Sequence, residues 1–187
     1  MRRFVFAVSG ASGMPLATTL LKALATTDDT EVHLIVSDAA LQVLRHENAT
    51  QVSDIECLAH TVHKADDFSA GPASGSWRHD GMIVCPCSMS TLASIAHGTG
   101  TNLIHRAADV TLKERRPLVL VARETPLSRI HLSNMLLASE AGAVIMPPCP
   151  GFYSRPETVQ DVLDHLAGRI LDQVGVVHSL GRRWQGG

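Results

Sequence analysis

The sequence lacks several features that would assign a function at once. Its 187 residues contain no apolar run near the roughly 20 residues that a membrane-spanning helix needs. Its formal net charge is −2, so the charge gives no reason to expect nucleic acid or an anionic membrane as a partner. The first residues run directly into a strand pattern, without the longer apolar stretch of a signal peptide. We therefore expect a cytoplasmic protein.

Cysteines are few, and their spacing does not favour a metal. The four are Cys57, Cys85, Cys87 and Cys149. Two of them flank Pro86, too close together for a usual zinc knuckle. Cys57, His60 and His63 would share one face only if their stretch were helical, and a satisfied or exposed histidine is commoner than a ligand. We expect reduced, structural thiols and no metal.

Strand-like and helix-like segments alternate along the whole chain. Apolar runs predict strands at 4–8, 32–36, 82–85, 118–121 and 144–146. Helical spacing follows in several places, at residues such as Leu16 and Leu20 and at Leu92 and Ile95. Thr125 and Pro126 are typical of a helix start before a face of Ile130, Met135, Leu136 and Leu137. Pro156 predicts the start of a last helix.

This alternation predicts one α/β domain over residues 1–187, a doubly wound, Rossmann-like parallel sheet with helices on both faces. Residues 178–187 are expected to form a tail without periodicity. The stretch 65–77 is rich in Gly, Ser and Pro and predicts a loop, in which Phe68 and Trp77 are unusual because only 4% of the chain is aromatic. In such sheets ligands bind beyond the carboxyl ends of the strands.

The stretch "FVFAVSGASGMPLATTLLKAL" joins the first strand to the first helix through Gly10-Ala11-Ser12-Gly13. Backbone N–H groups and a hydroxyl at such a turn can bind a phosphate. The stretch has neither the glycine spacing of dinucleotide sites nor the Gly-Lys-Ser/Thr of a nucleoside-triphosphate loop. A plain tight turn is the alternative. "CPCSMSTLA" repeats the arrangement later, with Ser88 as a helix N-cap.

Charged residues gather in the second half of the chain. Arg106, Lys113 and Arg123 are interleaved with apolar residues, and Arg123-Glu124 directly follows a predicted buried strand. Tyr153 and Arg169 come later. Together such cations, a hydroxyl and a carboxylate can bind a phosphate ester and transfer a proton.

These motifs resemble those of the UbiX-type flavin prenyltransferases, especially the branch known as the B subunit of hydroxyarylic acid decarboxylases. The resemblance covers essentially the whole chain. It rests on the glycine loop, "PASGS" at 72–76, "CPCSMSTLA" at 85–93, "NLIHRAADVTLKERRPLVLVARETPL" at 102–127, "NML" at 134–136, "PGFYSRP" at 150–156 and "RRW" at 182–184.

The resemblance implies an enzyme that alkylates reduced FMN at N5 with a dimethylallyl group and closes the group onto C6. The product, prenylated FMN, serves UbiD-type decarboxylases. The donor is dimethylallyl phosphate, whose leaving phosphate can be stabilised by cations without a metal. The family forms homo-oligomers, often dodecamers, with flavin sites shared between subunits.

Site residues carry over by position. FMN-binding residues are implied at Gly10, Ala11, Ser12, Ser37, Ser88, Met89, Ser90, Thr91, Arg123 and Trp184. The donor phosphate is implied to contact Arg106, Lys113, Tyr153 and Arg169. Catalytic roles fall to Glu124, Glu47, Lys113 and Phe68.

The two carboxylates differ in sequence context. Glu124 lies at the predicted carboxyl edge of the sheet and is our choice for proton transfer, unless it only pairs with Arg123 or Arg129. Glu47 lies in the polar stretch "RHENATQ", where a merely solvated carboxylate is the simpler interpretation.

The sequence departs from the family in two places. Met14-Pro15-Leu16-Ala17 replaces a small residue, Tyr and Gly, which indicates the subgroup rather than another activity. Phe68 stands where many members have Trp, a stronger cation–π partner for an allylic cation.

Two other functions stay open at this point. A flavin-dependent cysteine decarboxylase of the related fold would carry other motifs than Pro72-Ala73-Ser74-Gly75 and Met146-Pro147-Pro148-Cys149. A non-catalytic FMN carrier would not need a second phosphate site.

Overall fold

A computed structural model describes residues 1–47, 51–181 and 183 of the chain. The strands are β1 (Arg2–Val8), β2 (Thr30–Val36), β3 (Thr61–Lys64), β4 (Gly81–Cys87), β5 (Leu118–Ala122) and β6 (Val144–Ile145). The helices are α1 (Met14–Ala25), α2 (Asp38–Glu47), α3 (Val52–Glu56), α4 (Met89–His97), α5 (Leu103–Lys113), α6 (Arg129–Glu140) and α7 (Val159–Gln173), with the short 3-10 helix η1 (Gly71–Ala73). Strands and helices therefore alternate as predicted.

The strands form one parallel sheet in the order β3-β2-β1-β4-β5-β6. The chain moves outward from β1 to β3, then crosses back to place β4 against the other side of β1. The crevice of such a sheet opens where the strand order reverses, beyond the carboxyl ends of β1 and β4. This topology fixes where the loops that follow those two strands must meet.

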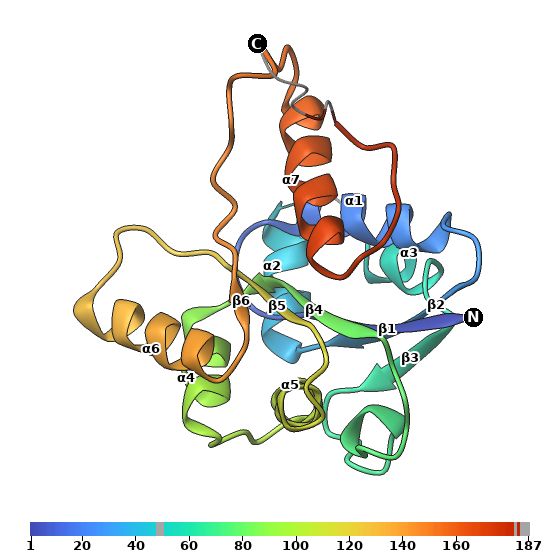
Figure 1. Ribbon diagram of the computed structural model, residues 1–187, viewed down its shortest axis with the longest axis vertical. Coiled ribbons are helices and arrows are strands. Elements are labelled where there is room, and N and C mark those ends of the chain that lie inside the picture. Colours follow the sequence, from blue (N-terminus) through green and yellow to red (C-terminus); the bar gives the residue numbers. More distant parts are fainter. Residues whose placement is uncertain (48–50, 182, 184–187) are drawn as a thin grey trace.

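Two hydrophobic cores cover the two faces of the sheet, which confirms the predicted layers. Phe4 and Phe6 of β1 face one core, with helices α1 and α7, and Val5 and Ala7 face the other, with α4 and α5. Figure 1 shows α1 and α7 above the sheet and α4, α5 and α6 below it. Strands buried on both faces explain the continuous apolar runs in the sequence.

Two predicted helix starts were wrong. Helix α6 begins at Arg129 rather than at Pro126, because the Ser128 side chain caps it by accepting a hydrogen bond from the His131 N–H at 3.2 Å. Helix α7 begins after Thr158 rather than at Pro156, because the Thr158 hydroxyl accepts from the N–H three residues on. In both places a hydroxyl cap determined the boundary and the proline lay outside the helix.

The apolar face predicted for α6 is not a core face. Ile130 is 72% exposed, Leu136 59% and Leu137 39%, whereas Asn134 and Ala138 are buried. Of the predicted face, Met135 packs against the core, while Ile130, Leu136 and Leu137 stay uncovered within one chain.

Strand β3 was not predicted, and its composition explains why. Its four residues, Thr61–Lys64, form an edge strand with mostly exposed side chains, so the segment has no buried apolar run. A metal site in the same stretch would require Cys57, His60 and His63 to lie on one helix. Helix α3 ends at Glu56, so these three residues do not share a helical face, and the described residues contain no group of three metal-ligating side chains arranged to hold a metal ion.

Two of the four cysteines agree with a structural role. Cys85 and Cys87 are buried free thiols, and burial raises the pKa of both, that of Cys87 to about 12. Cys57 and Cys149 are exposed. Among the helices that the structure describes, none is both long and apolar enough to span a membrane.

Candidate functional site at the carboxyl edge of the sheet

The glycine loop between β1 and α1 is held in a tight conformation. A Cβ on Gly10 would lie 2.5 Å from the Ala39 Cβ, so only glycine lets this loop approach the start of α2 so closely. Gly13 has a φ of 128°, a conformation that side chains rarely adopt. The loop therefore needs its glycines for its shape, which is the tight-turn interpretation, and that shape brings its backbone to the sheet edge.

Glu47 contacts this loop, so the prediction of a merely solvated carboxylate was wrong. Its carboxylate accepts hydrogen bonds from the Gly13 N–H at 3.1 Å and from the Met14 N–H at 2.9 Å. A carboxylate at a helix N-terminus is stabilised by the helix dipole and the unpaired N–H groups there. The N–H groups of Gly13 and Met14 are thus already in use, and the Ala11 N–H donates to the Ser9 carbonyl. A phosphate at the loop would have to bind through the N–H groups of Gly10 and Ser12 and the Ser12 hydroxyl.

The second hydroxyl-rich turn, after β4, meets the first one directly. The Ser88 N–H donates to the Ser9 hydroxyl oxygen at 2.8 Å, and that hydroxyl donates to the Pro86 carbonyl at 2.9 Å. Ser9 is buried, and no motif in the sequence predicted a role for it. It joins the loops after β1 and β4 at the point where the strand order reverses.

Ser88 and Ser37 both act as helix caps. The Ser88 hydroxyl oxygen accepts from the Thr91 N–H at 3.2 Å, which confirms the predicted N-cap of α4. The Ser37 hydroxyl oxygen accepts from the Ala40 N–H at 3.2 Å at the start of α2. Both side chains are partly exposed at the sheet edge, as is Met89, while Ser90 is exposed. Capping explains their presence and leaves their second lone pairs able to accept from a ligand.

Arg123 and Glu124 follow β5 at the same edge, as predicted. The Arg123 N–H donates to the Cys87 carbonyl at 3.1 Å, which brings this segment beside the turn that contains Ser88. Both side chains are exposed. The Glu124 carboxylate accepts from the Thr125 N–H at 3.0 Å, and within the described ranges it forms no ion pair with Arg123 or Arg129. The Glu124 carboxylate is therefore exposed at the edge, where its hydrogen-bond donor is a backbone N–H.

Two of the four predicted phosphate-binding residues lie on α5. Arg106 donates from Nε to the Ala73 carbonyl at 3.1 Å and forms an ion pair with Asp109. Lys113 ends the helix and pairs with Glu114 at 2.6 Å. A Cβ on Gly75 would lie 2.7 Å from the Lys113 Nζ. Both cations therefore border the loop that contains the "PASGS" motif.

The other two lie on the opposite face of the sheet. Tyr153 and Arg169 line a pocket of about 370 Å³ beside α7, together with His165, Asp172 and Arg183. Helix α7 packs on the core that contains Phe4, and α5 packs on the core that contains Val5. One chain therefore brings the four residues together as two pairs and not as one cluster, because α5 and α7 cover opposite faces of the sheet (Figure 1).

Two further predictions concern aromatic residues. Phe68 lies in the loop before η1 and is 52% exposed, so it is not a core residue. Trp184 lies outside the described residues.

Comparisons with known proteins agree with this geometry. A family model described as Flavoprotein matches residues 1–171. The chain is 50% identical over 183 residues to flavin prenyltransferase UbiX of Deinococcus radiodurans, covering 98% of this chain and 93% of that protein.

Two solved structures are similar throughout. A crystal structure of AnUbiX in complex with FMN and dimethylallyl pyrophosphate has a TM-score of 0.96 at 48% identity and covers 99% of this chain and 98% of the other. A dodecameric FMN-dependent UbiX-like decarboxylase from Escherichia coli has a TM-score of 0.95 at 48% identity, covering 98% and 100%.

The parallel sheet, with hydroxyl-rich turns at its reversal point, defines a flavoprotein. Within that class, the chain belongs to the UbiX flavin prenyltransferase family, which confirms the resemblance of its motifs.

Proposed function

We propose that this chain transfers the dimethylallyl group of dimethylallyl phosphate to N5 and C6 of reduced FMN, and that the prenylated FMN serves a UbiD-type decarboxylase. The observation that carries the proposal is the meeting of two hydroxyl-rich turns at the strand reversal, where the Ser88 N–H contacts the Ser9 hydroxyl, beside the exposed Arg123 and Glu124. The similarity to AnUbiX, which was crystallised with FMN and dimethylallyl pyrophosphate, supports both substrates.

The residues at the edge suit FMN in their chemistry. Among the described residues, no hydrogen bond engages the N–H groups of Gly10 and Ser12, and the Ser12 side chain is partly exposed beside them. Amide and hydroxyl donors of this kind bind phosphate. Ser37, the turn 88–91 and the Arg123 guanidinium would contact the rest of the flavin. Reduced FMN supplies the nucleophilic nitrogen and carbon, and Trp184 stays a predicted contact.

The leaving group is phosphate, so the protein must stabilise negative charge as the carbon–oxygen bond breaks. Arginine and lysine can do this directly, and Tyr153 can donate a hydrogen bond. As ring closure removes a proton from C6, a carboxylate at the site can accept it. We assign this role to Glu124, because Glu47 is already bound to the N–H groups of Gly13 and Met14.

We infer that the complete phosphate site forms between chains. Arg106 and Lys113 lie on one face of the sheet and Tyr153 and Arg169 on the other, so one phosphate can contact all four only if a second chain supplies one pair. The exposed apolar side chains of α6, such as Ile130 and Leu136, give such an assembly a surface to cover. The Escherichia coli relative is dodecameric, and we propose a homo-oligomer of that kind here.

The direct test mixes the protein anaerobically with reduced FMN and either dimethylallyl monophosphate or pyrophosphate, followed by mass spectrometry of the released flavin. A gain of one dimethylallyl group is expected, with release of phosphate from the monophosphate donor or of pyrophosphate from the pyrophosphate donor. An unchanged flavin that stays bound with both donors would instead indicate a carrier. Loss of carbon dioxide from a cysteine derivative would indicate the decarboxylase alternative.

The shared site has its own test. Lys113→Ala and Arg169→Ala variants are expected to be poorly active alone. Dissociated and reassembled together, they should restore roughly one site in four, because each site draws its two pairs from different chains at random. If verified mixed oligomers recovered no prenylation activity, all four residues of a working site would come from one chain.

A further inference from the structure

Tyr153 is held in place by a histidine that no motif identified. The Tyr153 hydroxyl lies 3.2 Å from the His165 Nε2, and the two rings meet edge to face with centroids 5.5 Å apart. Tyr153 is 57% exposed, so core packing does not fix its ring. Gly151 gives the pair room, since a Cβ there would lie 2.9 Å from the Tyr153 ring and 3.5 Å from the His165 Nε2.

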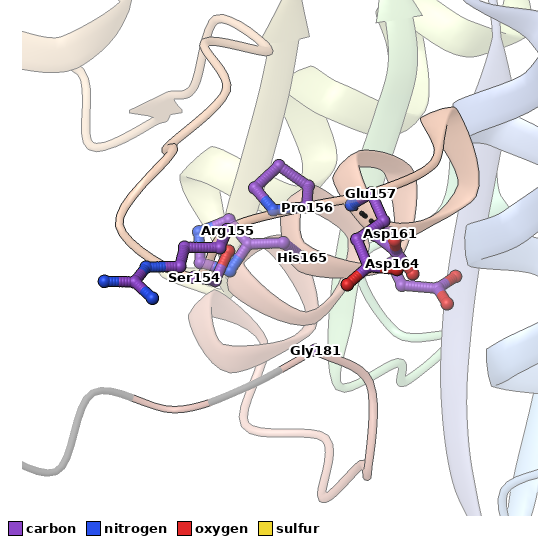
Figure 2. A pocket seen from close by; sticks show the side chains of 8 residues that line it. All are labelled: Ser154, Arg155, Pro156, Glu157, Asp161, Asp164, His165 and Gly181. Carbon is purple, nitrogen blue, oxygen red and sulfur yellow. Dashed lines mark hydrogen bonds between the residues drawn. The ribbon is translucent and has the colours of Figure 1, made fainter.

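The backbone of His165 is held in position by the elements around it. It lies in the middle of α7, and the returning C-terminal segment packs against it, because a Cβ on Gly181 would lie 3.0 Å from the His165 Cα. The imidazole lines two pockets, the one that contains Tyr153 and Arg169 and a neighbouring one of about 340 Å³. Figure 2 shows His165 in this second pocket, with Ser154 and Arg155 to one side and Asp161 and Asp164 to the other.

The charged groups around the imidazole are engaged with other partners. In the neighbouring pocket, the Asp161 carboxylate accepts from the N–H groups of Glu157 and Thr158 at 2.9 and 2.8 Å, and Asp164 accepts from the Gln160 amide at 2.7 Å. Both carboxylates thus accept hydrogen bonds at the start of α7.

On the other side of the imidazole, Asp172 binds the cations. It pairs with Arg169 at 3.1 Å and with Arg183 at 2.7 Å, and the His178 Nε2 lies 3.1 Å from the same carboxylate. The Tyr153 hydroxyl is thus a hydrogen-bond partner of His165 that also belongs to the predicted phosphate site.

We propose that His165 is a positioning residue that turns the Tyr153 hydroxyl toward the donor phosphate. A phenol carries one hydrogen, and phosphate oxygens only accept. When the His165 Nε2–H donates to the phenol oxygen, the phenol hydrogen is left for the phosphate. The opposite arrangement, in which the phenol donates to the imidazole, would present only lone pairs to an anion. The proposal therefore assigns the Nε2–H tautomer to His165 and rests on the proposed function of this site.

The test compares two substitutions at one position. His165→Leu removes the hydrogen bond and keeps an apolar side chain. His165→Gln places an amide nitrogen near the position of Nε2 and can still donate. We expect His165→Leu to raise the KM for dimethylallyl monophosphate about three- to tenfold, the worth of one hydrogen bond, with little change in kcat. His165→Gln should restore most of the affinity. Flavin binding and melting temperature should change little in the glutamine variant.

A double-mutant cycle with Tyr153→Phe decides between positioning and a general structural role. Without the hydroxyl, His165→Leu should have no further effect on donor affinity. Fully additive effects of the two substitutions, or equal losses in the leucine and glutamine variants, would overturn the proposal. Donor affinity is measured by calorimetry as well as by turnover. A wild type that binds the donor but never prenylates FMN would refute the proposed function, while the cycle would still decide the role of His165.

Discussion

Two groups of ionisable side chains in this protein differ sharply in what surrounds them. At the carboxyl edge of the sheet, Arg123 and Glu124 are exposed. On the side of β2 and β3, His33 and His79 are buried and form hydrogen bonds within the protein. The charges of the first group are accessible to a ligand, while the side chains of the second group form hydrogen bonds within the fold.

The histidine group shows what structural use of ionisable residues looks like. The His33 Nδ1 lies 2.8 Å from the His63 Nε2, and the His33 Nε2 lies 2.8 Å from the Glu31 carboxylate. The Trp77 ring meets His33 edge to face, and the Arg3 guanidinium stacks on Trp77. Burial lowers the pKa of both His33 and His63. Perturbed pKa values commonly indicate active sites, but these histidines form hydrogen bonds with each other and with Glu31.

The comparison predicts that substitutions at the edge change activity without changing stability, and that substitutions in the histidine group do the reverse.

The largest effect is expected for Glu124→Gln. This variant keeps the size of the side chain and its hydrogen bond to the Thr125 N–H while removing the ionisable group. Formation of finished prenylated FMN should fall about 10²- to 10⁴-fold, the usual worth of a positioned acid or base. Single-turnover mixing with mass and absorbance detection measures it.

Glu47→Gln is the matched control for that experiment. Since Glu47 binds the N–H groups of Gly13 and Met14, its loss should loosen the glycine loop and weaken FMN binding more than it slows ring closure. Ring closure at the wild-type rate in Glu124→Gln would move the proton-transfer role to Glu47 or to a water molecule.

Arg169→Ala should give the next largest effect. A charge-assisted hydrogen bond contributes about 1.5–3 kcal/mol, so donor affinity should fall by roughly one to two orders of magnitude while FMN stays bound. The Arg169 side chain is 54% exposed, so the melting temperature should hardly change. Titration of each variant with dimethylallyl monophosphate checks the first expectation and thermal melting the second. Equal donor affinity in wild type and variant would remove Arg169 from the phosphate site.

Phe68→Leu should have a smaller effect on rate. A ring beside a developing cation contributes about 0.5–2 kcal/mol, so the chemical step should slow by a few-fold to roughly thirtyfold. Because Phe68 is 52% exposed, the alternative of a packed core residue predicts a loss of stability that we do not expect. Phe68→Trp should be tolerated. An unchanged rate with a lowered melting temperature would show that the ring only packs.

The sequence was sufficient for features that depend on local pattern. The strands other than β3 follow from apolar runs, and the Ser88 cap follows from hydroxyl chemistry over a few residues. The contact of Glu47 with Gly13 could not be predicted, because it joins residues 34 apart through the packing of α2 against the glycine loop. The separation of the predicted phosphate-binding residues depends on which face of the sheet each helix covers. The His165–Tyr153 contact crosses an irregular segment whose path no periodicity predicts.

The smallest expected effect is on stability in acid, and it tests whether the buried histidines serve the fold. His79 is buried, its Nδ1 lies 3.2 Å from the Gly81 carbonyl, and burial together with the nearby charge of Arg116 lowers its pKa to about 4. Between its ordinary pKa of 6.5 and about pH 4, the unfolded chain binds a proton that the folded chain does not. Lowering the pH through this window therefore favours unfolding, and neither further acid nor a pH above 6.5 adds to the effect.

Each pH unit in that window costs at most about 1.4 kcal/mol for one such group, which corresponds to a few degrees in melting temperature for a chain of this size. His79→Asn keeps an amide donor near the Gly81 carbonyl but cannot be protonated, so its melting temperature should fall less steeply between pH 6.5 and 4 than that of the wild type. His33 and His63 should account for part of the remaining slope, because burial lowers their pKa as well. Prenylation at neutral pH should be unchanged in His79→Asn. If the variant kept wild-type acid sensitivity but lost prenylation activity, His79 would contribute to the site rather than to acid stability. The proposed difference between the two regions would then be wrong.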